Sequence, residues 1–227
     1  MHTRLFTSDV PADPQGIVLM LHGGAEHSER PVDRRNGALV RSRMMFQTMQ
    51  TRVVASDHVL CMLRFSVKGW NAGVGHEPSP VVDARWALDH LRREFADLPV
   101  VLLGHSMGGR AAIHVADDPS VVGVVGLAPW WSPQDPIDTV AGKHLVAAHG
   151  SRDRITSAKQ TRRYLQRADG IAASTKFVDM GFIGHYMLTN VKHWNRVACK
   201  ESLAAFEPAP SDEDCGSHHV GGITPPN

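Results

Sequence analysis

The chain has 227 residues, of which 42% are hydrophobic and 21% are charged, the composition of an ordinary globular protein. That length suits one domain, or one domain with a tail, and it can bury a sizeable core. The formal net charge of +1 gives no reason to expect nucleic acid or an anionic membrane as a partner.

Targeting and redox signals are weak in this sequence. Residues 1–16 lack the apolar segment of a signal peptide, and no apolar run approaches the roughly 18 residues that cross a membrane. The three cysteines, Cys61, Cys199 and Cys215, are widely spaced and odd in number, so no disulfide framework is expected. We therefore expect a soluble, cytoplasmic protein.

The first half of the chain alternates short apolar runs with amphipathic segments. Apolar residues at helical spacing indicate helices, and continuous apolar runs indicate buried strands. The pattern predicts an edge strand around residues 4–7, strands at residues 17–21 and 59–65, and helices over residues 38–52 and 81–95.

A strand, a tight turn and a helix follow. Residues 100–103 read as a strand buried on both faces, and residues 107–116 suit a helix. Between them, residues 104–108 read Gly-His-Ser-Met-Gly, which fits the nucleophile elbow pattern G-x-S-x-G. Such a turn holds Ser106 in a strained backbone conformation, and the flanking glycines leave room for close neighbours. We predict Ser106 as the nucleophile.

The second half continues the alternation up to residue 206. Strands are expected at residues 121–128, 145–149 and 173–180, and helices at residues 157–167 and 187–206. From residue 207 the sequence has no periodicity and many turn formers, which predicts a disordered tail over residues 207–227. Residues 1–206 therefore read as one α/β domain with a mostly parallel sheet of six or seven strands and helices on both faces.

A serine hydroxyl needs a base to take its proton, and that base needs an orienting acid. In an open α/β sheet these groups collect at the carboxyl ends of the strands. His185 lies on a glycine-flanked loop after the last strand and is the expected base. His149, at a strand end before the acid, is expected to be structural, and His193 falls within a helix.

Asp153 is the favoured acid because it follows the strand at residues 145–149 directly. It could instead be only a helix N-cap. The alternatives are Asp135 and Asp138, which follow the preceding strand, and Asp179, which lies within the last strand. The chain order Ser106, Asp153, His185 matches the nucleophile–acid–base order of hydrolases with this elbow.

With these motifs in order, the chain resembles an α/β-hydrolase over about residues 15–206. His-Gly-Gly follows an early strand at residues 22–24, and the elbow, His-Gly-Ser-Arg-Asp at residues 149–153 and Gly-His at residues 184–185 follow in turn. The resemblance implies an oxyanion hole made by the backbone N–H of Met107 and one from the His-Gly-Gly loop, which we assign to Gly24 with Ala25 as the next candidate. The loop lacks the third glycine of the lipase HGGG pattern.

The sixteen residues 129–144 are too few to build the helical cap domain of larger members, so we expect a fairly open site. Trp70, Trp130 and Trp131 follow strand ends on the catalytic side and could pack in the core or form a wall of an apolar pocket. Cys215 with His218 and His219 lacks a fourth ligand, so no metal site is expected there.

These observations predict a serine hydrolase, carboxylesterase-like, acting on an ester or thioester of a small to medium apolar acid without any cofactor. The partner would be that small-molecule substrate; the sequence leaves the oligomeric state open. Acyl transfer, C–C bond cleavage and amide hydrolysis would use the same triad. A non-catalytic binding protein on the same fold is the alternative from another class.

Overall fold

A computed structural model describes residues 3–73 and 75–207 of the chain. The expected disordered tail, apart from Glu207, lies outside the described residues, as do Cys215, His218 and His219. The other two cysteines, Cys61 and Cys199, are buried free thiols.

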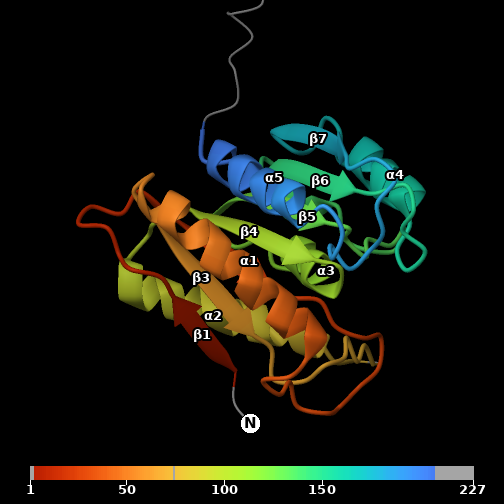
Figure 1. The fold of residues 1–227 in the computed structure, drawn as a ribbon, viewed down its shortest axis with the longest axis horizontal. Coiled ribbons are helices and arrows are strands. Elements are labelled where there is room, and N and C mark those ends of the chain that lie inside the picture. Colours follow the sequence, from red (N-terminus) through yellow and green to blue (C-terminus); the bar gives the residue numbers. More distant parts are fainter. Residues whose placement is uncertain (1–2, 74, 208–227) are drawn as a thin grey trace, which may run out of the picture.

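Seven strands form a single sheet in the order β1-β3-β2-β4-β5-β6-β7 (Figure 1). Only β1 is antiparallel to its neighbour, and the other pairs are parallel. The strands are β1 (Arg4–Thr7), β2 (Gly16–Leu21), β3 (His58–Arg64), β4 (Val100–His105), β5 (Val121–Leu127), β6 (His144–His149) and β7 (Ser174–Asp179). The predicted edge strand and the predicted sheet of six or seven strands are therefore confirmed.

Helices cover both faces of the sheet, which explains why the central strands are continuous apolar runs. In Figure 1, α1 and α5 lie side by side in front of the sheet, and α2 and α3 pack together on the opposite face. Every residue of β2 and β4 is buried as a result. The helices are α1 (Gly37–Val54), α2 (Ser79–Phe95), α3 (Met107–His114), α4 (Ala158–Ala168) and α5 (Val191–Ala204).

The link between β5 and β6 is short. Its only regular element within the described residues is the three-residue 3-10 helix η1 (Asp138–Val140). The prediction that this segment builds no cap domain is confirmed, and the carboxyl ends of β4, β5 and β6 carry no additional layer there.

Strand order brings two motif-bearing loops together. β4 is the central strand, and β2 lies between β3 and β4. The chain leaves β2 through α1 to reach β3, and then returns through α2 to β4 on the other side. Ligands of open α/β sheets bind in the crevice at such a switch point, outside the carboxyl ends of the strands. The His-Gly-Gly loop after β2 and the elbow after β4 both lie there.

The last helix begins later than predicted. The sequence predicts a helix from residue 187, whereas α5 starts at Val191. Met187 and Asn190 have left-handed backbone conformations, with φ of 55° and 53°, which cannot continue a right-handed helix. The extra loop residues lie next to His185, so this difference affects the candidate site directly.

Candidate active site

The elbow at the end of β4 has the strained geometry that its sequence predicts. Ser106 has φ 53° and ψ −116°, a combination that L-residues rarely adopt. A Cβ at Gly104 would lie 2.4 Å from the Gly108 carbonyl oxygen, and one at Gly108 would lie 2.2 Å from that of Leu21. Both positions therefore require glycine, because larger residues would push β2, β4 and α3 apart.

Ser106, His185 and Asp153 are joined by hydrogen bonds although they come from three separate loops. The Ser106 hydroxyl lies 3.0 Å from His185 Nε2, and His185 Nδ1 lies 2.8 Å from Asp153 Oδ2. The side chains of His185 and Asp153 are 5% and 1% exposed. With Nδ1–H donating to the carboxylate, Nε2 carries the lone pair that accepts the serine proton.

The two carboxylate oxygens of Asp153 have different hydrogen-bond partners. Oδ1 accepts hydrogen bonds from the backbone N–H groups of Ile155 and Thr156, and Oδ2 faces the histidine. Burial alone would raise the pKa of this carboxyl, but hydrogen bonds from two histidines and two backbone N–H groups hold it well below its usual value. Asp153 is not the N-cap of α4, because Ser157 fills that position.

A second histidine reaches the same carboxylate. His149 Nε2 lies 3.1 Å from Asp153 Oδ2, and its Nδ1 lies 3.0 Å from the Thr161 hydroxyl. The Thr156 hydroxyl is 2.9 Å from the same Asp153 oxygen and 3.1 Å from His185 Nδ1. From the sequence we predict a structural role for His149 and no role for Thr156. The feature that could have indicated a contact between His149 and Asp153 is that His149 ends the strand that leads into Asp153.

The other candidate acids lie elsewhere. Buried Asp135 lies 2.8 Å from Arg110 Nε and 3.0 Å from His114 Nε2. Asp179 is exposed and pairs with Arg162 at 3.3 Å. Asp138 begins η1. His193 lies in α5, as predicted.

A cavity of about 250 Å³ opens beside Ser106. Gly24 and Trp130 line it, together with Ala25, Glu26, Ile155 and Thr156. Met107 begins α3 directly after the serine. Gly24 is so close to the Met107 side chain that a Cβ there would lie 2.4 Å from Met107 Cε. The structure therefore places the two residues of the expected oxyanion hole beside each other and beside the serine.

Of the three tryptophans expected at the pocket, only Trp130 is among the residues that line this cavity. Trp131 is buried against Tyr164, with its indole N–H donating to the Gly109 carbonyl at 2.9 Å. Trp70 is buried too, and the Arg110 guanidinium lies 4.6 Å from its ring and 4.5 Å from that of Trp130. Trp131 and Trp70 therefore belong to the core, and Arg110 supports the wall formed by Trp130.

Comparisons with known proteins agree with this architecture. A family model described as serine aminopeptidase, S33, matches residues 69–148, which include Ser106 but end before Asp153 and His185. A search of curated proteins gave no match.

Solved structures match nearly the whole chain. A thermophilic esterase from Thermogutta terrifontis superposes with a TM-score of 0.68 at 14% identity, covering 93% of this chain and 92% of its own. A serine hydrolase without a lid from Xanthomonas campestris gives 0.63 at 14% identity, covering 92% and 91%. A monoacylglycerol lipase from Paleococcus ferrophilus gives 0.62 at 14% identity, covering 90% and 100%. This chain has the α/β-hydrolase fold.

Two further histidines brace the loops of this α/β-hydrolase fold. His22 Nδ1–H donates to the Gly23 carbonyl at 2.7 Å, and its Nε2 accepts from the Phe65 N–H at 3.2 Å. His105 Nε2–H donates to the His185 carbonyl at 3.1 Å. Burial lowers the pKa of His22 to about 4, and burial with the neighbouring His185 lowers that of His105 to about 3. Both rings are therefore neutral at pH 7.

The loop that carries His185 is fixed from the α1 side. Arg41 on α1 is buried, and its Nε donates to the Met187 carbonyl at 3.1 Å while Nη2 donates to Asn195 Oδ1 at 3.1 Å. These bonds tie the left-handed Met187 to both α1 and α5. The His185 ring is therefore hydrogen-bonded to Asp153, while the backbone around it is held at the His185 and Met187 carbonyls.

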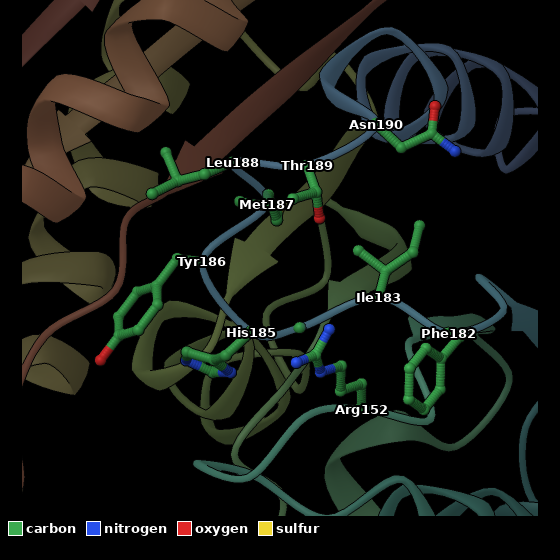
Figure 2. A pocket seen from close by; sticks show the side chains of 10 residues that line it. Arg152, Phe182, Ile183, His185, Tyr186, Met187, Leu188, Thr189 and Asn190 are labelled. Carbon is green, nitrogen blue, oxygen red and sulfur yellow. The ribbon is translucent and has the colours of Figure 1, made fainter.

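A second, larger cavity of about 500 Å³ lies along this loop. Figure 2 shows His185, Arg152, Phe182 and Tyr186 around it, with Leu188 near its edge. His185 lines this cavity and is hydrogen-bonded to Ser106, which lines the smaller one.

Within residues 3–73 and 75–207, no group of three or more histidine, cysteine or acidic side chains could hold a metal ion. No helix there is both long enough and apolar enough to pass through a bilayer.

Proposed function

We propose that the protein is a serine hydrolase that cleaves an ester or thioester of a small to medium apolar acid through an acyl-enzyme on Ser106. The observation that carries the proposal is the hydrogen-bonded chain from Ser106 through His185 to Asp153. The esterase and lipase activities named for two of the similar structures belong to those proteins, and they support the proposal as analogies of fold.

In the proposed reaction, Ser106 Oγ attacks the carbonyl carbon while His185 Nε2 takes the hydroxyl proton. The negative charge that develops on the carbonyl oxygen is stabilised by the backbone N–H groups of Met107 and Gly24, at the positive end of α3. Asp153 keeps the imidazole in the required tautomer and stabilises its positive charge. His185 then gives the proton to the departing alcohol or thiol.

The second half repeats these steps with water. His185 takes a proton from the water molecule, whose oxygen attacks the acyl carbon, and the bond to Ser106 Oγ breaks as the serine regains its proton. This route needs no cofactor.

Amide hydrolysis is the second candidate, because the matching family model is described as a serine aminopeptidase. An aminopeptidase needs an anionic group for the substrate ammonium, and Glu26 lines the cavity beside Ser106. Assays with p-nitrophenyl esters and with aminoacyl p-nitroanilides distinguish ester hydrolysis from aminopeptidase activity. If the protein is an aminopeptidase, Glu26→Gln should impair hydrolysis of the anilides and leave hydrolysis of the esters unchanged.

A fluorophosphonate probe tests the proposal most directly. We expect one label per chain, no label on Ser106→Ala, and hydrolysis of p-nitrophenyl acetate or butyrate that disappears in the same variant. Labelling that survives the substitution would contradict the assignment of the nucleophile. A labelled protein that hydrolyses no ester or amide would favour acyl transfer or C–C bond cleavage, and an unlabelled one would favour a binding protein.

A further inference from the structure

The cavity of about 500 Å³ along the His185 loop is lined by His185 itself. In the proposed function, on which this inference rests, His185 Nε2 donates a proton to the leaving oxygen or sulfur. The leaving group therefore lies on the His185 side of Ser106, and the carbonyl oxygen lies on the side of Gly24 and Met107. Cavities of 300–1,000 Å³ are typical of small-molecule sites.

The walls of this cavity expose large apolar side chains next to the catalytic centre. Phe182, Tyr186 and Leu188 are 77%, 61% and 70% exposed, and all three lie within one seven-residue stretch. Clusters of exposed apolar residues beside a cavity mark binding surfaces more often than they mark ordinary protein surface. The site therefore suits an aromatic or otherwise apolar leaving group.

The charged side chain that lines this cavity is a cation, Arg152. The Arg152 guanidinium lies 5.2 Å from the centre of the Phe182 ring and, in the view of Figure 2, projects between Phe182 and His185. Among the described residues Arg152 has no carboxylate within salt-bridge distance, and no acidic residue lines the cavity. By contrast, Glu26 lines the smaller cavity beside Ser106.

The cavity is held in shape before any substrate binds. Met187 and Asn190 keep left-handed backbones, and Arg41 bonds the Met187 carbonyl. The Arg152 backbone N–H donates to the Ile183 carbonyl at 3.2 Å, which joins the Asp153 loop to the His185 loop. A site fixed in this way loses little conformational entropy when a ligand binds.

We propose that this cavity binds the leaving group, and that Arg152 selects an aromatic or apolar alcohol or thiol with an anionic group at its far end. Phe182 provides the face against which the ring packs, and Arg152 pairs with the anion. The acyl group occupies the smaller cavity, next to Trp130 and Glu26. The inferred substrate class is a short-chain ester of an anionic aromatic alcohol.

The test compares 4-acetoxybenzoate with the neutral 4-acetoxybenzamide, using the ratio of their kcat/KM values. Dividing the wild-type ratio by that of a variant cancels the difference in intrinsic reactivity between the two esters. We expect Arg152→Gln to lower the preference for the charged ester roughly fivefold, a size appropriate to an exposed ion pair. The wild-type preference should also weaken as salt is added.

Arg154→Gln is the matched control. Arg152 and Arg154 flank Asp153 on either side, so removing either positive charge changes the electrostatic potential at the triad in the same direction. The inference requires that Arg154→Gln keep the wild-type ratio. An equal ratio in wild type and Arg152→Gln, or an equal drop in both variants, would overturn it.

A binding measurement on Ser106→Ala separates this inference from the proposed function. Saturation-transfer NMR of 4-acetoxybenzoate and 4-acetoxybenzamide on Ser106→Ala, with and without Arg152→Gln, needs no turnover. Stronger binding of the charged ester that depends on Arg152 supports the leaving-group site even if neither ester is hydrolysed. Turnover of both esters without an Arg152-dependent difference in binding would overturn the site and leave the hydrolase proposal standing.

Discussion

His149 Nε2 lies 3.1 Å from Asp153 Oδ2, the oxygen that also lies 2.8 Å from His185 Nδ1. His149 approaches the carboxylate from the end of β6 and His185 from the loop after β7, and the His149 side chain is 0% exposed. A second fixed donor to this oxygen helps to hold the carboxylate in position for His185. His149 therefore acts as a positioning residue for the triad.

Replacing His149 should reduce turnover without weakening substrate binding. In His149→Leu the carboxylate loses one hydrogen bond to a charged group, an interaction worth about 1.5–3 kcal/mol. We expect kcat for p-nitrophenyl acetate to fall by about tenfold or more with KM little changed. His149→Gln keeps a side-chain N–H and should recover much of the rate. A purely structural residue would instead lower the melting temperature and leave kcat per folded molecule unchanged.

Asp153 and Asp135 should give opposite phenotypes. Asp153→Asn removes the charge that fixes the His185 tautomer, and the same substitution of the triad acid in a serine protease costs on the order of 10⁴ in turnover. Asp135→Asn should change kcat little but should lower stability, because it leaves the partly buried Arg110 and His114 without their shared carboxylate. Activity assays and urea denaturation of both variants check this, and the reverse ranking of activities would move the acid to the loop after β5.

Acid should destabilise the protein below about pH 6.5, and His22 and His105 are two causes. Their folded pKa values of about 4 and about 3 lie below the value of 6.5 for an unperturbed histidine. As pH falls from 6.5 toward 4, the unfolded chain binds protons that the folded protein does not. Unfolding free energy should therefore fall by about 1.4 kcal/mol per pH unit for each ring. The low folded pKa of Asp153 acts in the same direction below about pH 4.

Urea denaturation at pH 6.5, 5.5 and 4.5 measures this slope. His105→Gln keeps an N–H near the His185 carbonyl and removes the titrating ring. The slope of unfolding free energy against pH should therefore decrease by about 1.4 kcal/mol per pH unit, the contribution of one proton. His27→Gln is the control, because the His27 side chain is 75% exposed, and it should leave the slope unchanged. An unchanged slope in His105→Gln would show that this ring does not stay neutral in the folded protein.

The sequence is most informative where local chemistry allows only one type of residue at a position. The runs that form β2 and β4 are apolar throughout because both faces are covered, and Gly104 and Gly108 flank Ser106 because no Cβ fits there. These constraints make the elbow and the sheet predictable. They also place Asp153 and His185 at strand ends that meet at one edge of the sheet.

Side-chain direction at the loops is where prediction failed. Trp130 and Trp131 are adjacent after β5, yet one lines the cavity beside Ser106 and the other packs on Tyr164. Nothing local distinguishes them, because the choice depends on Arg110 and Tyr164, which come from distant elements. The late start of α5 has a similar origin: Arg41 on α1 holds the Met187 carbonyl outside the helix.

The dependence of activity on acyl-chain length should distinguish the role of Trp130 from that of Trp131. Each methylene that the cavity of about 250 Å³ covers adds about 0.8 kcal/mol to transition-state binding, and further carbons lie in water and add nothing. We expect kcat/KM over a p-nitrophenyl ester series to peak at short or medium acyl chains and then to flatten or fall. Trp130→Ala should lower or shift that peak.

Trp131→Ala is the matched comparison, and its effect should be on stability. Its ring is 1% exposed and its N–H donates to the Gly109 carbonyl, so truncation should cost about 3–5 kcal/mol of unfolding free energy. The acyl-length profile of the folded fraction should keep its wild-type shape, since Trp131 does not line the cavity. The open-pocket description would be wrong if long-chain esters proved to be the best substrates and Trp130→Ala matched the parent across the series.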